Sequence, residues 1–180
     1  MNNYITTKRL IIRPIMHNDV YDIHKYAGDK SITMMMFLPN ESLDETKKFV
    51  EYAVKEWNKI ELNDREYVII FNKKIIGGIN LEYKENKKSC EIGWTIHSKY
   101  RNRGFATEAA NALIKYAFDI LKADKIIAHC DSKNIASETV MKKLKMILVS
   151  NNGTRYYPKT GITSEEYLYS ITKQEYANII

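Results

Sequence analysis

The sequence predicts a mixed α/β protein that forms one domain over residues 1–180, with a largely antiparallel sheet. Short apolar runs follow one another closely between residues 67 and 96, which is typical of an antiparallel meander. An amphipathic segment then separates the apolar runs at residues 90–96 and 125–130, and such a strand–helix–strand unit should be parallel and right-handed. Apolar residues make up 44% of the chain and charged residues 28%, which is enough apolar surface for a core.

The first elements are a strand and a helix. Residues 8–13 (KRLIIR) predict a short strand that ends at Pro14, because proline has no N–H to donate to a ladder. Asn18 or Asp19 can cap a helix over residues 20–27.

A second helix begins at Ser42 and continues to Trp57. Glu45 completes a capping-box pattern with Ser42, and apolar residues follow at helical spacing. The run MMMF at residues 34–37, between the two helices, is typical of core filling. It could instead line an adaptable substrate entrance, because thioethers repack easily.

Three strands follow the second helix. Residues 67–71 (YVIIF), 75–81 (IIGGINL) and 90–96 (CEIGWTI) have the apolar, β-branched character of strands. Polar turns at residues 72–74 and 85–88 connect them, and these turns are short enough for antiparallel hairpins.

The last part of the chain predicts two helices and three strands. A long helix over residues 105–121 precedes a strand at residues 125–130, and a shorter helix covers residues 135–144. Strands at residues 146–150 and 167–171 complete the sheet.

Composition excludes several classes of protein. The chain has no apolar stretch of ~18 residues and no secretory signal pattern, so we expect a cytoplasmic protein without a membrane partner. Cys90 and Cys130 are too few for a disulfide framework or a zinc site, and we expect no metal. The net charge of +6 is spread over dispersed lysines. Such a pattern favours a solvated surface, or else a basic rim around one anionic ligand, over nucleic-acid binding.

The segment at residues 100–108 (YRNRGFATE) carries the clearest chemical signal. Gly104 opens a helix whose first N–H groups are unpaired, and its missing Cβ lets a ligand approach the main chain. Arg101 and Arg103 add forked donors that suit phosphate oxygens, and Ala106 keeps the approach narrow. The segment therefore predicts a phosphate or diphosphate site. The alternative is that Gly104 merely relaxes a turn beside solvated arginines.

Four motifs resemble one family in the same order. RNRGFA matches the Arg/Gln-x-x-Gly-x-Gly/Ala loop of the GCN5-related N-acetyltransferases (GNAT), and CEIGWTIHSKYRNRGFATEA resembles the surrounding segment of that family. The opening TTKRLIIRP with HNDV, and the later Asn134 to Ser137 followed by Lys143 and Leu144, are also similar to it. The branch that it resembles includes the ribosomal-protein N-terminal acetyltransferases of RimJ/RimL type. The resemblance implies a mixed sheet of about seven strands with a splayed parallel pair and about four helices.

The resemblance also implies a reaction and a cosubstrate. Such enzymes transfer acetyl directly from acetyl-CoA to an amine in a ternary complex, with the pantetheine arm along a strand and the diphosphate on the loop amides. The cofactor-binding residues that it implies are Ile92, Trp94, Ile96, Arg101, Asn102, Arg103, Gly104, Phe105, Ala106, Thr107, Asn134 and Ser137.

Two catalytic residues are implied in the same way. Many members have a tyrosine that protonates the leaving thiolate; Met141 stands at that position here, and the RimJ/RimL branch instead implies Ser137. Glu66 is favoured as the base for the amine proton, with Glu82 and Glu91 as alternatives. All three carboxylates could equally be solvent-facing strand residues.

Some assignments have structural alternatives. Asn134 could simply cap the following helix, a role compatible with a cofactor contact, and Ser137 could bond its own backbone. His97 and His129 are expected to pack or to face solvent. Lys145 stands where the family has glycine, so a strained helix end is expected there.

The acceptor is left open by the sequence. A peptide N-terminus, a polyamine, an amino acid or an aminoglycoside-like amine would fit, and the protein could be a monomer or a homodimer. We expect specificity to reside at residues 34–37, near Trp57, and in a loop at residues 155–157. The alternative function is a non-catalytic acyl-CoA-binding or regulatory domain of the same fold.

Overall fold

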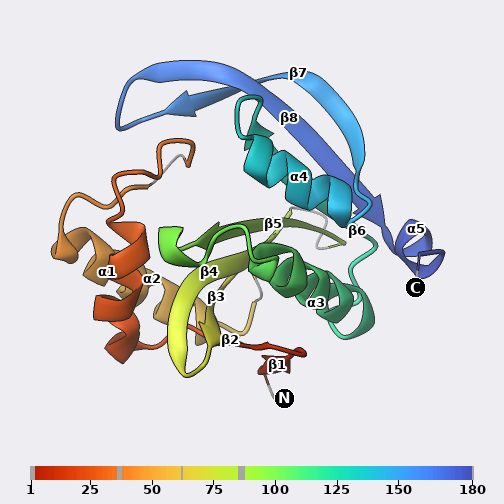
Figure 1. Ribbon diagram of the computed structural model, residues 1–180. Helices are drawn as coiled ribbons and strands as arrows, with labels where there is room; N and C mark the ends of the chain where they lie inside the picture. The colour runs from red at the N-terminus through yellow and green to blue at the C-terminus, as the bar shows by residue number, and fades with distance from the viewer. Residues whose placement is uncertain (1–2, 36–37, 62, 85–87, 180) are drawn as a thin grey trace.

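The computed structural model describes residues 3–35, 38–61, 63–84 and 88–179, and in it a mixed sheet of eight strands runs through the molecule (Figure 1). The strands lie in the order β1-β2-β3-β4-β5-β6-β8-β7. Their bounds are β1 Ile5–Thr6, β2 Leu10–Pro14, β3 Asp64–Phe71, β4 Lys74–Tyr83, β5 Ser89–Ile96, β6 Lys125–Asp131, β7 Ile147–Tyr157 and β8 Ile162–Thr172. The predicted mixed α/β class is confirmed.

Helices cover both faces of the sheet (Figure 1). They are α1 Val20–Ala27, α2 Leu43–Trp57, α3 Phe105–Asp119, α4 Ile135–Lys143 and α5 Lys173–Ala177, with short 3-10 turns at His17–Asp19 and Ser98–Tyr100. The larger apolar core lies under α3 and α4, and a smaller one lies between α1, α2 and the other face of β3. Among the described residues, no helix combines the length and apolar character that crossing a membrane requires.

The parallel pair β5 and β6 diverges soon after it begins. Pairing runs only from Ser89 with Lys125 to Glu91 with Ile127. Beyond Glu91, β5 remains paired with β4 on its other side as far as Ile96. The second half of β5 therefore has main-chain groups on its β6 side that no neighbouring strand of the sheet pairs.

Three features of the C-terminal half differ from the sequence expectations. β7 and β8 are each 11 residues long, so residues 155–157 belong to a strand and not to the predicted loop. The polar residues 150–153 interrupt the apolar run, yet the pairing of β7 with β8 resumes after two register shifts. Helix α3 ends at Asp119, two residues earlier than expected.

Two short elements are absent from the sequence expectations. β1 has only two residues and pairs with β2, which brings the sheet to eight strands where about seven were expected. Helix α5 begins at a capping box between Thr172 and Glu175. The predicted turn at residues 85–88 lies largely outside the described residues, as do Met36 and Phe37.

Candidate active site

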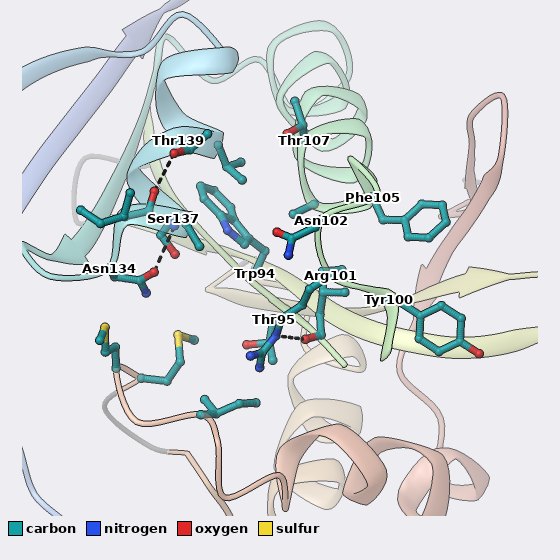
Figure 2. Close-up of a pocket in the computed structure, with 18 of the residues that line it drawn as sticks. Trp94, Thr95, Tyr100, Arg101, Asn102, Phe105, Thr107, Asn134, Ser137 and Thr139 are labelled. Atoms are coloured by element: carbon teal, nitrogen blue, oxygen red, sulfur yellow. Dashed lines mark hydrogen bonds between the residues drawn. The ribbon is translucent and has the colours of Figure 1, made fainter. Parts of the chain in front are cut away.

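A cavity of about 690 Å³ opens where β5 and β6 diverge. Its walls come from the end of β5, the start of α3, one side of α4 along its length and residues 31–35 after α1. Figure 2 shows Trp94 between Asn134 and Ser137 on one side and Asn102 and Thr107 on the other. The cavity therefore joins the three segments in which the sequence predicts a site.

The start of α3 forms one wall of the cavity. Gly104 is its N-cap with a φ of 77°, and Asn102 has a φ of 60°, so the chain turns sharply before the helix. Glu108 donates its N–H to the carbonyl of Gly104 at 3.0 Å, which leaves the N–H groups of the residues between them without helical partners. Such a helix start attracts anions.

Ten of the twelve residues implied as cofactor ligands line the cavity. They are Trp94, Ile96, Arg101, Asn102, Gly104, Phe105, Ala106, Thr107, Asn134 and Ser137. Arg101 is fixed at its edge, because its Nε donates to the carbonyl of Ile96 at 3.1 Å.

Ile92 does not line the cavity, because its side chain is 2% exposed and belongs to the core under α3. The role that the resemblance implies for it is one of main-chain contact.

Arg103 also lies outside the cavity lining, contrary to the sequence expectation. Its guanidinium carbon is 5.2 Å from the ring centre of Phe71, 5.8 Å from that of Tyr100 and 4.9 Å from that of Phe105. Cation–π contacts of this kind hold the arginine against the aromatic cluster and away from the cavity. Arg103 therefore supports the loop from behind.

The start of α4 brings Asn134 and Ser137 to the opposite wall. The Asn134 side chain accepts the N–H of Ser137 at 3.1 Å, so it caps the helix as expected and still lines the cavity. Among the described residues, no hydrogen bond occupies the Ser137 hydroxyl. Met141, where the family commonly has tyrosine, is 1% exposed in the core. Of these two positions, only Ser137 carries a proton donor at the cavity.

Glu66 lies on β3, outside the cavity lining. Burial raises its pKa well above the ordinary value, and the charge of Asp64 raises it further. Burial also raises the pKa of Asp64, to about 6, with a contribution from Glu82. Glu66 pairs in register with Asn80, and Asn80 pairs with Gly93 of β5. This row connects Glu66 to the strand that borders the cavity.

The other two carboxylates are less suited to accept a proton. Glu82 is solvent-exposed. Glu91 accepts from Nδ1 of His129 at 2.9 Å and pairs with Lys84 at 2.6 Å. Although burial alone would raise the pKa of Glu91, these two partners lower it to about 2. His129 packs against a partner as the sequence led us to expect.

The residues expected to set acceptor specificity are only partly brought together. Met34 and Met35 line the cavity. Trp57 does not: its ring contacts Tyr67 edge-on, and its Nε1 donates to the Glu66 carbonyl at 2.8 Å. Arg155 is buried on β7 and pairs with Glu166 at 2.7 Å.

Several cavity residues were not expected from the sequence. They are Ser31, Ile32, Thr33, Thr139, Val140 and Lys143. Lys143 also lines a second hollow beside the α3 start, together with Glu108 and Asn111. The sequence named Lys143 only as part of the motif that follows Asn134 and Ser137, and assigned it no place in a site.

Comparison with known proteins identifies the class. The family model described as Acetyltransferase (GNAT) domain matches residues 9–147, so the chain belongs to this family. The resemblance predicted from the four motifs is thereby confirmed. The chain is an enzyme of the N-acetyltransferase type.

Particular relatives extend over the full chain. A Bacillus subtilis (strain 168) protein described as "Uncharacterized N-acetyltransferase YnaD" is 33% identical over 178 residues, which are 96% of this chain and 99% of that protein. The crystal structure of a GNAT-family acetyltransferase from Bacillus anthracis has a TM-score of 0.82 and 28% identity, covering 96% and 99% of the two chains. RimL, a ribosomal-protein acetyltransferase solved with coenzyme A, shares the fold with a TM-score of 0.85 at 16% identity, over 96% and 99% of the chains.

Proposed function

We propose that this chain transfers the acetyl group of acetyl-CoA to a primary amine within a complex that holds both substrates. One observation carries the proposal: the start of α3, with Gly104 at positive φ, and the diverging part of β5 border the same cavity. A helix start of this kind suits a diphosphate, and a strand edge without a neighbour suits the amides of a pantetheine arm. The volume of about 690 Å³ lies in the range of small-molecule sites.

The amides of residues 102–107 would hold the diphosphate, with Arg101 and the Thr107 side chain beside them. Main-chain groups near Trp94 and Ile96 would hold the pantetheine arm, and N–H groups there would polarise the thioester carbonyl. Asn134 would contact the arm from the opposite wall, as its place in the lining supports.

The transfer needs one proton removed and one delivered. As the acceptor nitrogen forms its bond to the acetyl carbon, the carbon–sulfur bond breaks and the electron pair remains on sulfur. Ser137 would donate its hydroxyl proton to this thiolate, and solvent would restore it. Glu66 would accept the proton that leaves the nitrogen.

Glu66 would act through water. Glu66 and Gly93 lie two strands apart, and each strand spacing is about 4.8 Å. The distance between them therefore exceeds the reach of a hydrogen bond. Gly93 lets the Asn80 side chain occupy this row, because a Cβ on Gly93 would lie 2.6 Å from the Asn80 side-chain oxygen. A chain of water beside Asn80 would connect the acceptor nitrogen to the carboxylate.

The acceptor would be a protein N-terminus or a small-molecule amine. The test measures release of free CoA thiol from acetyl-CoA over panels of peptides, polyamines and aminoglycosides, with CoA binding measured separately by calorimetry. Binding together with acetylation of one panel would support the proposal. Binding without turnover on any panel would favour the non-catalytic alternative, and absence of CoA binding would contradict both.

A further inference from the structure

The loop between β1 and β2 is fastened to the first turn of α3 through Glu108. One carboxylate oxygen of Glu108 accepts from the Thr7 hydroxyl at 2.6 Å and from the Arg9 main-chain N–H at 2.9 Å. The other oxygen accepts from Nε of Arg9 at 2.6 Å. Two residues at the N-terminus of the chain thus hold a residue about a hundred positions later.

The same arginine reaches the loop that precedes α3. Nη1 of Arg9 donates to the carbonyl of Arg103 at 3.0 Å. Nη2 lies 3.5 Å from the point where a Cβ on Gly104 would stand, and the guanidinium carbon lies 4.5 Å from the ring centre of Phe105. One side chain therefore contacts Arg103 and Phe105, the residues on either side of Gly104, and it does not line the cavity.

The loop has an irregular backbone. Asn102 has a φ of 60° and Gly104 has a φ of 77°, both in the left-handed region, which asparagine and glycine adopt more readily than other residues do. The shape of such a turn depends on the contacts around it. Glu108 and the Arg103 carbonyl lie on the two sides of the Gly104 turn. The Arg9 guanidinium donates a hydrogen bond to each of them and so connects the two sides.

We propose that Arg9 is a positioning residue for cofactor binding: it holds residues 103–108 in the shape whose amides bind the diphosphate of acetyl-CoA. The inference rests on the proposed function. It also gives a role to the Thr7–Arg9 part of the opening sequence motif, which does not line the cavity. The arrangement requires arginine, because a lysine amine cannot donate along two fixed directions from one planar group.

The test compares Arg9→Met with Lys8→Met, a neighbouring exposed lysine of the same loop. Arg9→Met should weaken CoA binding in calorimetry by about tenfold, which is the value of one charge-assisted hydrogen bond. The KM for acetyl-CoA should rise equally while kcat at saturation stays within about twofold. Lys8→Met should match the parent. Unchanged CoA affinity in Arg9→Met would overturn the inference.

An acetyl donor without the diphosphate distinguishes a loss of loop positioning in Arg9→Met from a general loss of stability. S-acetylpantetheine has no diphosphate, so its KM should be equal in the parent and in Arg9→Met. An equal loss for both donors would overturn the inference, because a merely structural defect affects the whole cavity. Arg9→Lys should recover only part of the affinity for CoA, and full recovery would contradict the role of the fork.

A second variant covers the case in which Arg9→Met does not fold. Glu108→Gln keeps the shape of the side chain and removes the charge that Arg9 contacts, and it should give the same difference between the two donors. The parent protein serves as the reference for the proposed function. If the parent does not bind CoA, the proposed function fails; if the parent binds and the variants bind equally well, only the role of Arg9 fails.

Discussion

Ser137 combines a free hydroxyl with a fixed position. Its own N–H is bound to the Asn134 side chain at 3.1 Å, so the first turn of α4 holds it at the cavity wall. No other hydrogen bond of the described residues competes for its hydroxyl. A serine hydroxyl is a weak acid, but a developing thiolate in a restricted cavity is a strong acceptor.

Replacing Ser137 with alanine should therefore slow turnover by about a hundredfold, since this is the low end of the contribution of a general acid. CoA affinity should stay unchanged, because the removed hydroxyl acts after binding. Single-turnover kinetics and calorimetry measure the two quantities. Ser132→Ala, outside the cavity lining, is the matched control. A rate equal to that of the parent would show that the proton comes from elsewhere.

Glu66 has a stability consequence as well as a proposed catalytic one. Its raised pKa means that the folded state favours the neutral carboxyl. This contribution to stability is complete below the ordinary pKa and is lost as pH rises through the pKa of the folded state. The charge of Asp64 acts in the same direction.

Glu66→Gln should accordingly become more stable relative to the parent as pH rises from about 4 to about 8, because glutamine stays neutral. Each kcal/mol gained should raise Tm by about 2–4 °C at this chain length. Turnover should fall by about a hundredfold if Glu66 is the base. Thermal unfolding at several pH values tests the first point, with Glu51→Gln, an exposed glutamate on α2, as control. Parental turnover would remove Glu66 from the mechanism.

At the scale of elements, the turn into α3 depends on a conformation that glycine adopts without strain. Gly104 has a φ of 77°, and among the described residues a Cβ there would meet only Arg9, at 3.5 Å. A substitution there is disfavoured by the backbone more than by crowding. Gly161, in the turn between β7 and β8, has a φ of 70°, and no described residue would lie within 4 Å of its Cβ.

These two glycines make a matched pair. Gly104→Val and Gly161→Val should each lose about 1–2 kcal/mol of unfolding free energy, because valine is strained at positive φ. Only Gly104→Val should weaken CoA binding, by about tenfold or more, since its turn aims the amides at the ligand. Calorimetry and denaturant unfolding measure the two effects. Equal CoA affinity in both variants would contradict the assignment of the loop.

Local sequence signals gave most elements of the fold, but contacts between distant residues decided the details. The capping residues at Ser42 and Asn134 and the glycine at the start of α3 are local, and the structure has helices there. The sequence could not distinguish Arg103 from Arg101, because the position of the Arg103 side chain depends on rings from three other elements. The length of β7 depends on pairing with β8 across two register shifts.

Prediction of the cavity from the sequence is also limited by contacts between residues that are distant in the chain. The side that we propose binds phosphate lies in one continuous segment, so a motif predicts it. The carboxylates depend on register: Glu91 is joined to His129, and Glu66 reaches β5 only through Asn80. A single sequence does not give these cross-strand partners, so only the resemblance favoured Glu66 over Glu82 and Glu91 until the strands were in place.

At the scale of the whole molecule, Lys159 connects the β7–β8 hairpin to the segment between α1 and α2. The β7–β8 hairpin arches toward the connection between α1 and α2 (Figure 1). There, Nζ of Lys159 donates to the Pro39 carbonyl at 2.6 Å and pairs with Glu45 at 3.0 Å. The earlier part of that connection, residues 31–35, forms a wall of the cavity. The hairpin thus anchors the connection whose earlier part forms this wall, and we expect the acceptor amine to enter beside it.

Lys159→Met should loosen this wall and change the KM for the acceptor by up to about fivefold, which is the value of a partly exposed ion pair. The KM for acetyl-CoA should not change, because its proposed contacts lie on α3, α4 and β5. Added salt should reduce the difference between parent and variant, since it screens the pair in the parent. Steady-state kinetics against Lys74→Met, an exposed lysine at the start of β4, measures the effect. A change confined to acetyl-CoA would show that the hairpin acts on the donor side and not on the acceptor path.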